Sequence, residues 1–507
     1  MQRTHLVLLQ LASLFCLISI FLFSFRGLPS ASFVLSQANP SIREWLTSLK
    51  ESATHAITKL TGIETIEDDA PLKPTEYVRP TPTHDGDAVA VTIDSYYSVG
   101  PSSTEIGNPG FDTQPYLKAI FDPGDQSFDR LECHSPAGSR YDYLRVGSTD
   151  GNSEGKRSFY FALDLHDNAD LLPRLMGTLI EIICFLGPRN CAVSIVEGRS
   201  EDGTYEILKA VTDELKAFGI LYILQKDDIN PLEGGNRIQA LAEFRNKALR
   251  PLISGKEQWS SNTIVIFLND VAICMEDILE LIHQHRFQQA DMVCPMDWTY
   301  VGPDPTFYDI WIARDMDGES FFEIPKDRSW DSAWNLLWNN PDARSRLFTG
   351  KPFQVFSCWN GAAVFRDEPI LDHGLSFRSN IEGECYQGEP QIFCKEMWSL
   401  GYGKIAVVPT VNLECSDEAA RRIKALKGYV SDWVGEGLTA AASSKIDWVR
   451  EPPRQVKCIP ADYAQQFLVD WNESLNNKGD STTNRSRLNT RRVSDQYWVP
   501  WNEGLPN

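Results

Sequence analysis

An apolar run that ends abruptly in an amide and a carboxylate constrains this chain most. Residues 264–268 are consecutively apolar, and Asn269 and Asp270 follow at once. Such a run is typical of a strand buried on both faces, as in a parallel sheet flanked by helices. Ligands of open α/β sheets bind outside the carboxyl ends of the strands, so we expect Asp270 to face a ligand. The alternative is that both residues cap a helix that begins near Met275.

Strand and helix patterns alternate on both sides of this run. Strands are predicted at 159–165, 191–196, 220–224, 264–268, 291–294 and 405–408, and helices at 168–186, 204–218, 237–250, 275–285 and 390–400. Strands separated by helices of ten to twenty residues indicate βαβ units. The sequence therefore predicts the α/β class, with a mostly parallel sheet.

Composition limits the classes of partner. The chain has 507 residues, of which 42% are apolar, and a formal charge of −21. It is long enough for one large domain or two ordinary ones. The acidic balance and the absence of a basic cluster argue against nucleic acid as a partner. An anionic ligand would need local positive charge or a metal ion.

The amino terminus indicates membrane attachment. Residues 6–25 carry no charge, and a stretch of this length can span a bilayer. We therefore expect a signal anchor, preceded by a cytoplasmic tail at 1–5. A cleaved signal peptide is the alternative. Residues 26–110 are polar and proline-rich, as in a stem. The folded domain is predicted at 111–470 on the luminal side, followed by a polar tail at 471–507 with glycosylation sequons at Asn472 and Asn484.

The cysteines fit an oxidising compartment. Ten remain besides Cys16, an even number compatible with disulfides. We expect Cys184 and Cys274 to be buried thiols, because both lie within apolar patterns. Two pairs are plausible from the sequence, Cys385 with Cys394 and Cys358 with Cys415, although spacing does not fix the connectivity.

Polar residues near the strand ends are candidates for nucleotide binding. Glu197 ends the second predicted strand, and Asp202 belongs to the turn that follows. Acidic residues at such positions bind the ribose in dinucleotide folds, although no glycine-rich phosphate fingerprint is present. On the helix at 237–250, Arg245 falls on the apolar stripe. It pairs either with a core carboxylate or, together with Arg237 and Asn246, with a donor diphosphate beside Asp270.

The carboxyl half contains the candidate acceptor side. Aromatic rings stack on sugars and carboxylates bind hydroxyl groups, so we assign acceptor binding to Asp297, Trp298 and Trp359. Gly361 would allow close approach to a donor sugar. Trp334 and Trp338 are expected in the core.

Further carboxylates follow in the sequence. Glu384, in a glycine-rich loop with Glu389, is our candidate for contact with the reacting sugar, with surface exposure as the alternative. Asn412 or Glu414, after the last strand, would supply a further metal ligand.

Taken together, these motifs resemble a known family. The stretches Glu197-x-x-Ser200-x-Asp-Gly-Thr204, Leu-Ala-x-x-Arg245-Asn246, Phe267-Leu-Asn-Asp-Val271 and Trp359-Asn-Gly-Ala-Ala-Val-Phe365 are similar to the fungal α-1,3-mannosyltransferases of glycosyltransferase family 69, related to capsule-associated proteins. The resemblance covers roughly residues 112 to 460.

The resemblance implies a Golgi type II membrane enzyme with a GT-A-like, Rossmann-type fold. It implies GDP-mannose as donor, a glycan acceptor, retention of the anomeric configuration, and Mn²⁺ or Mg²⁺ held by Asp270 and Asn269. Catalysis would then involve Asp270, Glu384 and Arg245. The chain departs from the usual acidic motif, because Asn269-Asp270-Val271 has a single carboxylate.

Two other classes remain open from the sequence. A glycoside hydrolase would need two facing carboxylates, for which Asp270 and Glu384 are candidates. A family member that uses a UDP-sugar, or a non-catalytic partner in polysaccharide or capsule assembly, fits the single carboxylate. Metal-dependent donor binding separates the non-catalytic partner from an active transferase.

Overall fold

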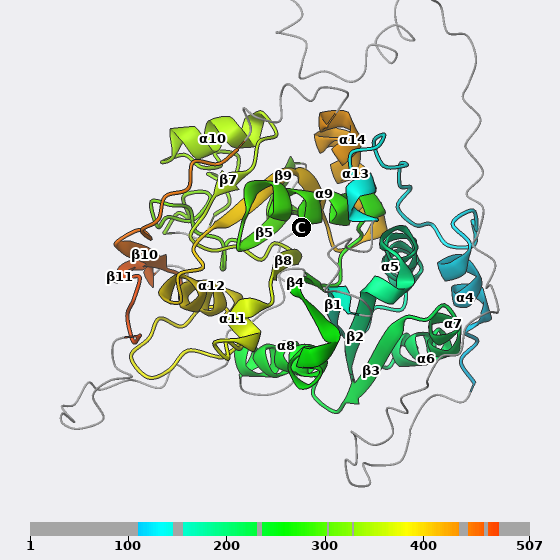
Figure 1. Cartoon of the computed structure of the whole chain (residues 1–507). Helices are drawn as coiled ribbons and strands as arrows, with labels where there is room; N and C mark the ends of the chain where they lie inside the picture. Colours follow the sequence, from blue (N-terminus) through cyan, green and yellow to red (C-terminus); the bar gives the residue numbers. More distant parts are fainter. Residues whose placement is uncertain are drawn as a thin grey trace, which may run out of the picture. The chain divides into compact units, whose positions relative to one another are not determined.

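A computed structural model of the chain describes residues 110–145, 156–230, 236–301, 304–326, 329–434, 445–460 and 465–475 (Figure 1). The chain divides into a unit of Met1–Thr81 and a unit of Pro82–Asn507, and all described residues belong to the second. The predicted tail and anchor, the predicted stem at 26–110 except its last residue, and most of the polar tail lie outside the described residues. No helix among the residues described is both long and apolar enough to cross a bilayer.

A large mixed sheet forms the centre of the described unit. Its strands follow the order β3-β2-β1-β4-β8-β5-β9-β7, and β6 pairs with β5. The strands are β1 (Arg157–Leu165), β2 (Cys191–Gly198), β3 (Leu221–Asp227), β4 (Trp259–Leu268), β5 (Met292–Val301), β6 (Asp304–Phe307), β7 (Phe353–Gln354), β8 (Ala362–Arg366) and β9 (Ile405–Leu413). A separate hairpin pairs β10 (Gln455–Cys458) with β11 (Phe467–Asp470).

Helices cover both faces of the sheet. The longer ones are α5 (Leu172–Leu186), α8 (Arg237–Ser254), α9 (Met275–Gln288), α12 (Glu389–Ser399) and α13 (Asp417–Lys427). The shorter ones are α4 (Gln114–Phe121), α6 (Thr204–Ala210), α7 (Thr212–Ala217), α10 (Pro341–Phe348), α11 (Glu368–Leu371) and α14 (Val430–Trp433). The predicted helix at 204–218 is thus two helices, whereas the predictions for α8, α9 and α12 agree with the structure to within a few residues.

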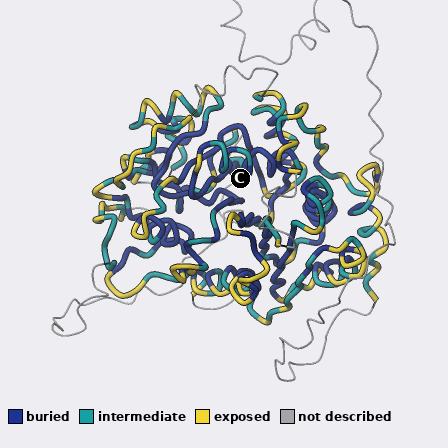
Figure 2. The backbone as a smooth tube through the Cα atoms, viewed as in Figure 1, coloured by how far each residue is buried: buried dark blue, intermediate teal, exposed yellow. Residues whose placement is uncertain are grey.

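Alternation along each strand divides the core into two layers. In β1, Phe161 and Leu163 join the core shared with α5 and α9, whereas Tyr160 and Ala162 join the core shared with α8. Successive side chains of a strand point to opposite faces, so a strand buried on both sides must be apolar throughout. The burial pattern shows this arrangement, with dark strands in the middle and exposed residues concentrated in the outer segments (Figure 2).

The sheet is less parallel than the sequence predicts. β3, β2, β1 and β4 are parallel to one another, and β5 is parallel to β9. β8, however, runs antiparallel between β4 and β5, and β7 is antiparallel to β9. An apolar run indicates burial but not strand direction, which is why the pattern could not reveal the reversal.

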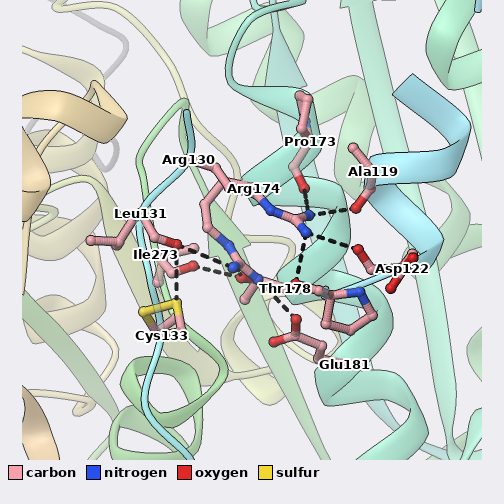
Figure 3. A network of polar contacts seen from close by, with 12 residues as sticks. Ala119, Asp122, Arg130, Leu131, Cys133, Pro173, Arg174, Thr178, Glu181 and Ile273 are labelled. Carbon is pink, nitrogen blue, oxygen red and sulfur yellow. Dashed lines mark hydrogen bonds and ion pairs between the residues drawn. A yellow bond between two sulfur atoms is a disulfide. The ribbon is translucent and has the colours of Figure 1, made fainter. Parts of the chain in front are cut away.

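The segment before β1 is fixed by two arginines (Figure 3). Arg130 donates a hydrogen bond of 2.8 Å to the carbonyl oxygen of Asp122, just after α4. Arg174, on α5, donates to the carbonyl oxygen of Leu131 at 3.3 Å and pairs with Glu181 at 3.0 Å. These charge-assisted bonds attach the segment to the end of α4 and to α5, where Arg174 also donates a 3.0 Å hydrogen bond to Thr178.

The disulfides differ from the sequence-based expectations. Sulfur bridges join Cys133 to Cys274, Cys294 to Cys358 and Cys385 to Cys458. Cys191, Cys394 and Cys415 form no disulfide within the described part of the chain. The pairs Cys385/Cys394 and Cys358/Cys415 were therefore wrong, and Cys274 is a bridge member rather than a thiol. Spacing in the sequence does not report which Cα atoms approach to within disulfide distance.

Trp334 and Trp338 also differ from expectation. They lie in turns between β6 and α10 and are 75% and 40% exposed, rather than forming core. A spacing of four residues places two side chains on the same face only in a helix. This segment forms turns, so the spacing does not bring the two rings together.

The Cys133–Cys274 bridge links the segment before β1 to the start of α9 across 141 residues of sequence. We expect the double substitution Cys133→Ser/Cys274→Ser to lower the free energy of unfolding by about 2–5 kcal/mol, because the unfolded chain loses a long-range constraint. Denaturant unfolding measures the change. The matched variant Cys415→Ser, at a free and exposed thiol, should shift stability by no more than about 0.5 kcal/mol; equal effects of the two would contradict this role of the bridge.

Candidate functional site

The carboxyl ends of β1 and β4 meet where the strand order reverses. β1 has β2 as its neighbour on one side and β4 as its neighbour on the other side. The chain therefore continues in opposite directions from β1, which is the arrangement of a topological switch point. Leu163 pairs with Leu268, so the last residues of β1 lie beside Asn269 and Asp270. The sequence prediction that Asp270 stands at a ligand-facing edge agrees with this position.

Asp270 combines solvent access with a crowded polar environment. The residue is exposed, and its carboxylate accepts a long hydrogen bond of 3.5 Å from the side-chain amide of Asn168. The surrounding protein nevertheless raises the pKa of Asp270, against the opposing effects of Asn168, Arg237 and Arg245. A ligand can reach the residue, because part of its surface is open to solvent. Asp270 is therefore an accessible oxygen donor at the strand end.

Asn269 is more constrained than Asp270. Its side-chain oxygen accepts a 3.0 Å bond from the indole of Trp359, and its backbone N–H donates to Gly361 at 3.0 Å. The amide therefore holds the loop that enters β8 against the end of β4. No group of three or more histidine, cysteine or acidic side chains is placed to hold a metal ion among the described residues.

Several further carboxylates surround Asp270. Burial raises the pKa of Asp164 to about 7 and that of Asp309 to about 6, and it raises the pKa of Asp297 well above its usual value. The charges of Asp309, Glu414 and Asp270 add to the effect on Asp297. The site is thus a dense acidic cluster in which like charges disfavour further ionisation.

Arg245 is the buried cation of this cluster. Its guanidinium pairs closely with Glu389 on α12 and lies 3.8 Å from Asp164 on β1. The group also lies 5.1 Å from the ring centre of Trp359, within cation–π range. Burial disfavours its charge, but Glu389 and Asp164 outweigh this and raise the pKa of Arg245. The interpretation of Arg245 as the partner of core carboxylates matches the observed contacts. Its direct contact with a donor stays a prediction.

The neighbours of Arg245 on α8 differ in role. Arg237 is the first residue of the helix and lies close enough to Asp270 for each charge to affect the other. Asn246 exchanges two hydrogen bonds with the backbone of Phe377, at 2.8 and 2.9 Å. Arg237 is therefore better placed than Asn246 to meet an anionic ligand.

The loop before β8 supplies the other wall of the site. Asn360 and Gly361 both have left-handed backbone conformations, with φ of 56° and 80°. A Cβ atom at Gly361 would lie 2.8 Å from Val271 and 3.4 Å from the carboxylate of Asp297. The glycine therefore allows the loop to approach both β4 and β5.

The residues predicted to bind the acceptor are mostly buried. Trp298 donates a 2.8 Å bond to Asn412, and Trp359 packs on Phe267 and Arg245 with only 2% of its surface exposed. Neither ring has a free face for stacking. Asp297 is close to the acidic cluster, and its acceptor contact stays a prediction. Tyr308 is a nearby aromatic residue that is 44% exposed.

Glu197 and Asp202 have local structural contacts. Glu197 is fully buried at the end of β2 and accepts a 2.7 Å bond from the backbone of Ser200. Asp202 accepts bonds from the backbones of Ala169 and Thr204. Both carboxylates therefore shape the loops after β1 and β2, and their donor contacts stay predictions.

Glu384 belongs to a different ionic cluster. It pairs with Arg378 and Lys395, and these cations lower its pKa to about 2. Its carboxylate also accepts a bond from the backbone of Ile381. These contacts describe a structural carboxylate, and its predicted catalytic role draws no support from them.

Sequence reasoning missed several members of the site. Asp164 interrupts an otherwise apolar strand one residue before its end, a signal that could have been noticed. Glu389 was recognised as an acid in the right loop, but Glu384 was preferred. Asp309 accepts a 2.9 Å bond from the backbone of Asn360 and carries no local signal of this role.

Comparison with known proteins shows similarity to one family over part of the chain. Residues 158–396 match the family model described as cryptococcal mannosyltransferase 1. The chain is 35% identical over 305 residues to alpha-1,3-mannosyltransferase CMT1 of Cryptococcus neoformans var. neoformans serotype D. That alignment spans 57% of this chain and 65% of the relative's length. These matches confirm the family resemblance deduced from the motifs.

Two solved structures are also similar at low identity. The crystal structure of S. aureus TarS 1-349 has a TM-score of 0.31 and 14% identity, over 51% of this chain and 60% of that one. The mannosyltransferase PcManGT from Pyrobaculum calidifontis, in complex with GDP-Man and Mn²⁺, has a TM-score of 0.32 and 11% identity. This match covers 54% of our chain and 62% of the PcManGT chain.

Removing the buried cation should be costly. We expect Arg245→Met to reduce the free energy of unfolding by about 3–5 kcal/mol, since it leaves Glu389 and Asp164 without their shared partner. Urea unfolding followed by circular dichroism measures this loss. The control Arg145→Met, at an exposed ion pair, should change stability by no more than about 0.5 kcal/mol. A loss of that small size for Arg245→Met would show that the pair does not organise the site.

The raised pKa of Asp164 predicts a pH dependence. The unfolded chain releases this proton near the ordinary pKa of 3.8, whereas the folded chain retains it until about pH 7. Between these values the folded state binds more protons, so its stability falls as the pH rises. We expect unfolding free energies from about pH 5 to about pH 7.5 to fall less steeply for Asp164→Asn than for the unchanged protein. Identical slopes would contradict the raised pKa.

Proposed function

Because residues 158–396 form a domain of the cryptococcal mannosyltransferase 1 family, we propose that this protein transfers mannose from GDP-mannose to a mannose-containing glycan, with α-1,3 linkage and retention. The name of the CMT1 relative supports the sugar and the linkage. The observation that carries the proposal is Asp270, an exposed carboxylate at the switch point of the sheet, within the matched domain. The sheet of this domain also supports a GT-A-like fold.

The charge of the site supports a metal-dependent donor. A nucleoside diphosphate is an anion, and the carboxylates around Asp270 would repel it unless a cation intervened. Mg²⁺, and similarly Mn²⁺, is commonly bound by one or two carboxylates together with substrate phosphates, rather than by a complete protein cage. The accessible oxygens of Asp270, without three preplaced ligands among the described residues, fit such a shared site. Asp270 would hold the ion, with Asn269 beside it, and the ion would stabilise negative charge on the departing diphosphate.

The protein groups provide the complementary positive charge. Arg237 begins α8, and the first N–H groups of a helix attract phosphate oxygens. In this proposal Arg237 orients the diphosphate. Arg245 acts through Glu389, Asp164 and Trp359, whose positions it fixes around the sugar-facing wall. Gly361 lets the loop before β8 lie close against Val271 and Asp297, which shapes this wall of the site.

The acceptor would approach from the side of Tyr308 and Asp297. Tyr308 is exposed next to the acidic cluster and offers both a ring face and a hydroxyl group to a glycan. The proposed setting is the Golgi lumen, with residues 6–25 as the membrane anchor. The three disulfides support an oxidising compartment.

The decisive experiment measures donor binding and turnover with purified full-length protein. GDP-mannose, UDP-xylose and UDP-glucose are titrated with Mn²⁺ or with EDTA, while the melting temperature and nucleotide release are recorded. We expect Mn²⁺-dependent stabilisation and GDP release with GDP-mannose, and Asp270→Asn should weaken donor binding by at least about tenfold. Nuclear magnetic resonance of the product reads the linkage and the anomeric configuration.

The matched control is Asp213→Asn, which removes an exposed carboxylate on α7 without changing donor binding. Binding that ignores both EDTA and the Asp270→Asn change would refute the metal assignment. Metal-dependent turnover of a UDP-sugar would show that the donor is a UDP-sugar and not GDP-mannose. Absence of any donor binding by the folded protein would favour the assembly-partner reading, for which the single carboxylate of Asn269-Asp270-Val271 is the motivating observation.

A further inference from the structure

A second polar site lies at the opposite edge of the sheet. A cavity of about 570 Å³ is lined by the first halves of β1 and β4, including Ser158 and Ser260. Lys404 lines it just before β9 begins, and Arg366 lines it where the antiparallel β8 ends. These are the amino ends of the parallel strands, whereas Asp270 follows a carboxyl end. The cavity is therefore separate from the site proposed for the donor.

The charge of this cavity is opposite to that of the chain. Three of its lining residues are cationic, namely Arg286, Arg366 and Lys404, and one is a carboxylate, Glu368. The whole chain carries a formal charge of −21, so a cationic lining is a local departure from the average. A concave surface lined by charges of one sign concentrates the electric field and attracts ligands of the opposite charge.

The cations are only partly neutralised by protein groups. Arg366 lies 3.4 Å from Asp291 and 3.2 Å from Glu368. Arg286 and Lys404 form no ion pair with any residue in the described part of the chain, although the charge of Lys404 is felt by Asp291. Burial lowers the pKa of Arg286, as expected for a guanidinium withdrawn from water without an acidic partner. An anion in the cavity would supply the missing charge.

A buried histidine adds an unsatisfied polar group. His285 lines the cavity, is only 7% exposed, and neither of its ring nitrogens makes a hydrogen bond of normal geometry among the described residues. The backbone of Asp291 favours the protonated ring, but burial and the nearby arginines lower its pKa to about 3. A neutral imidazole both donates and accepts, so it suits a ligand that carries hydroxyl groups.

The uncharged lining points to the same class of ligand. Ser261, Asn262 and Gln289 are exposed in the lining and offer hydroxyl and amide groups. The volume falls within the range of about 300–1,000 Å³ that is usual for small-molecule sites. We propose that this cavity binds an anionic saccharide, a sugar that carries a phosphate or a carboxylate group. This inference does not depend on the proposed transferase activity.

The test uses the purified full-length chain and isothermal titration calorimetry. Mannose 6-phosphate and glucuronate represent the two anionic classes, and mannose and inorganic phosphate are the matched partial ligands. We expect one anionic sugar to bind in a saturable manner, at least about tenfold more tightly than either partial ligand. The double variant Arg286→Gln/Lys404→Gln should weaken this binding by at least about tenfold, because both unpaired cations are lost.

Two controls separate the cavity from general effects. Lys351→Gln removes a positive charge outside the cavity and should leave the affinity unchanged. The double variant should keep the melting temperature and the circular dichroism spectrum of the unchanged protein, which shows that the variant folds. Absence of saturable binding by either anionic sugar would overturn the proposal, as would full affinity in the folded double variant. Equal binding of inorganic phosphate would overturn the assignment to a saccharide.

Discussion

The arrangement of the site depends on one buried guanidinium. Arg245 on α8 holds Glu389 of α12 and Asp164 of β1, and it stacks beside Trp359 in the loop that enters β8. These four elements are far apart in the sequence, and each brings a group that would be costly to bury alone. The positive charge of Arg245 allows these groups to be buried together. An uncharged residue at this position would leave two carboxylates in the core, so the local charge balance and the shape of the site are fixed together.

The same balance bears on the proposed binding of a diphosphate. The carboxylates at the strand ends create a negative potential, and Arg237 at the start of α8 is a cation whose charge acts on Asp270. A bound divalent cation would reverse the local sign and would change the ionisation of every neighbouring acid. In this view the raised pKa values of Asp164, Asp297 and Asp309 are a property of the metal-free protein. Donor and metal binding would then be coupled to proton release.

The sequence predicted those parts of the structure that depend on local chemistry. Strand β4 and its polar end were recognisable because a buried strand has to be apolar throughout and Asp270 breaks that rule. Arg245 was recognisable for the same reason, as a charge on an apolar stripe. The rest depends on contacts between distant residues. Glu384 and Glu389 lie five residues apart in similar surroundings, and only the packing of α12 against α8 distinguishes the partner of Arg245 from the partner of Lys395. The bridge between Cys133 and Cys274 and the direction of β8 likewise have no local signature.

Two stretches of the chain differ in how strongly the sheet fixes their length. The parallel strands β1 to β4 lie within 157–268, and their register sets the strand ends around Asp270. The excursion from 308 to 352 leaves the sheet after β6 and rejoins it at β7, so its length does not enter the register of any parallel pair. The part of this excursion beyond Tyr308 and Asp309, with its exposed Trp334 and Trp338, can therefore change in length or surface without shifting the strand ends around Asp270.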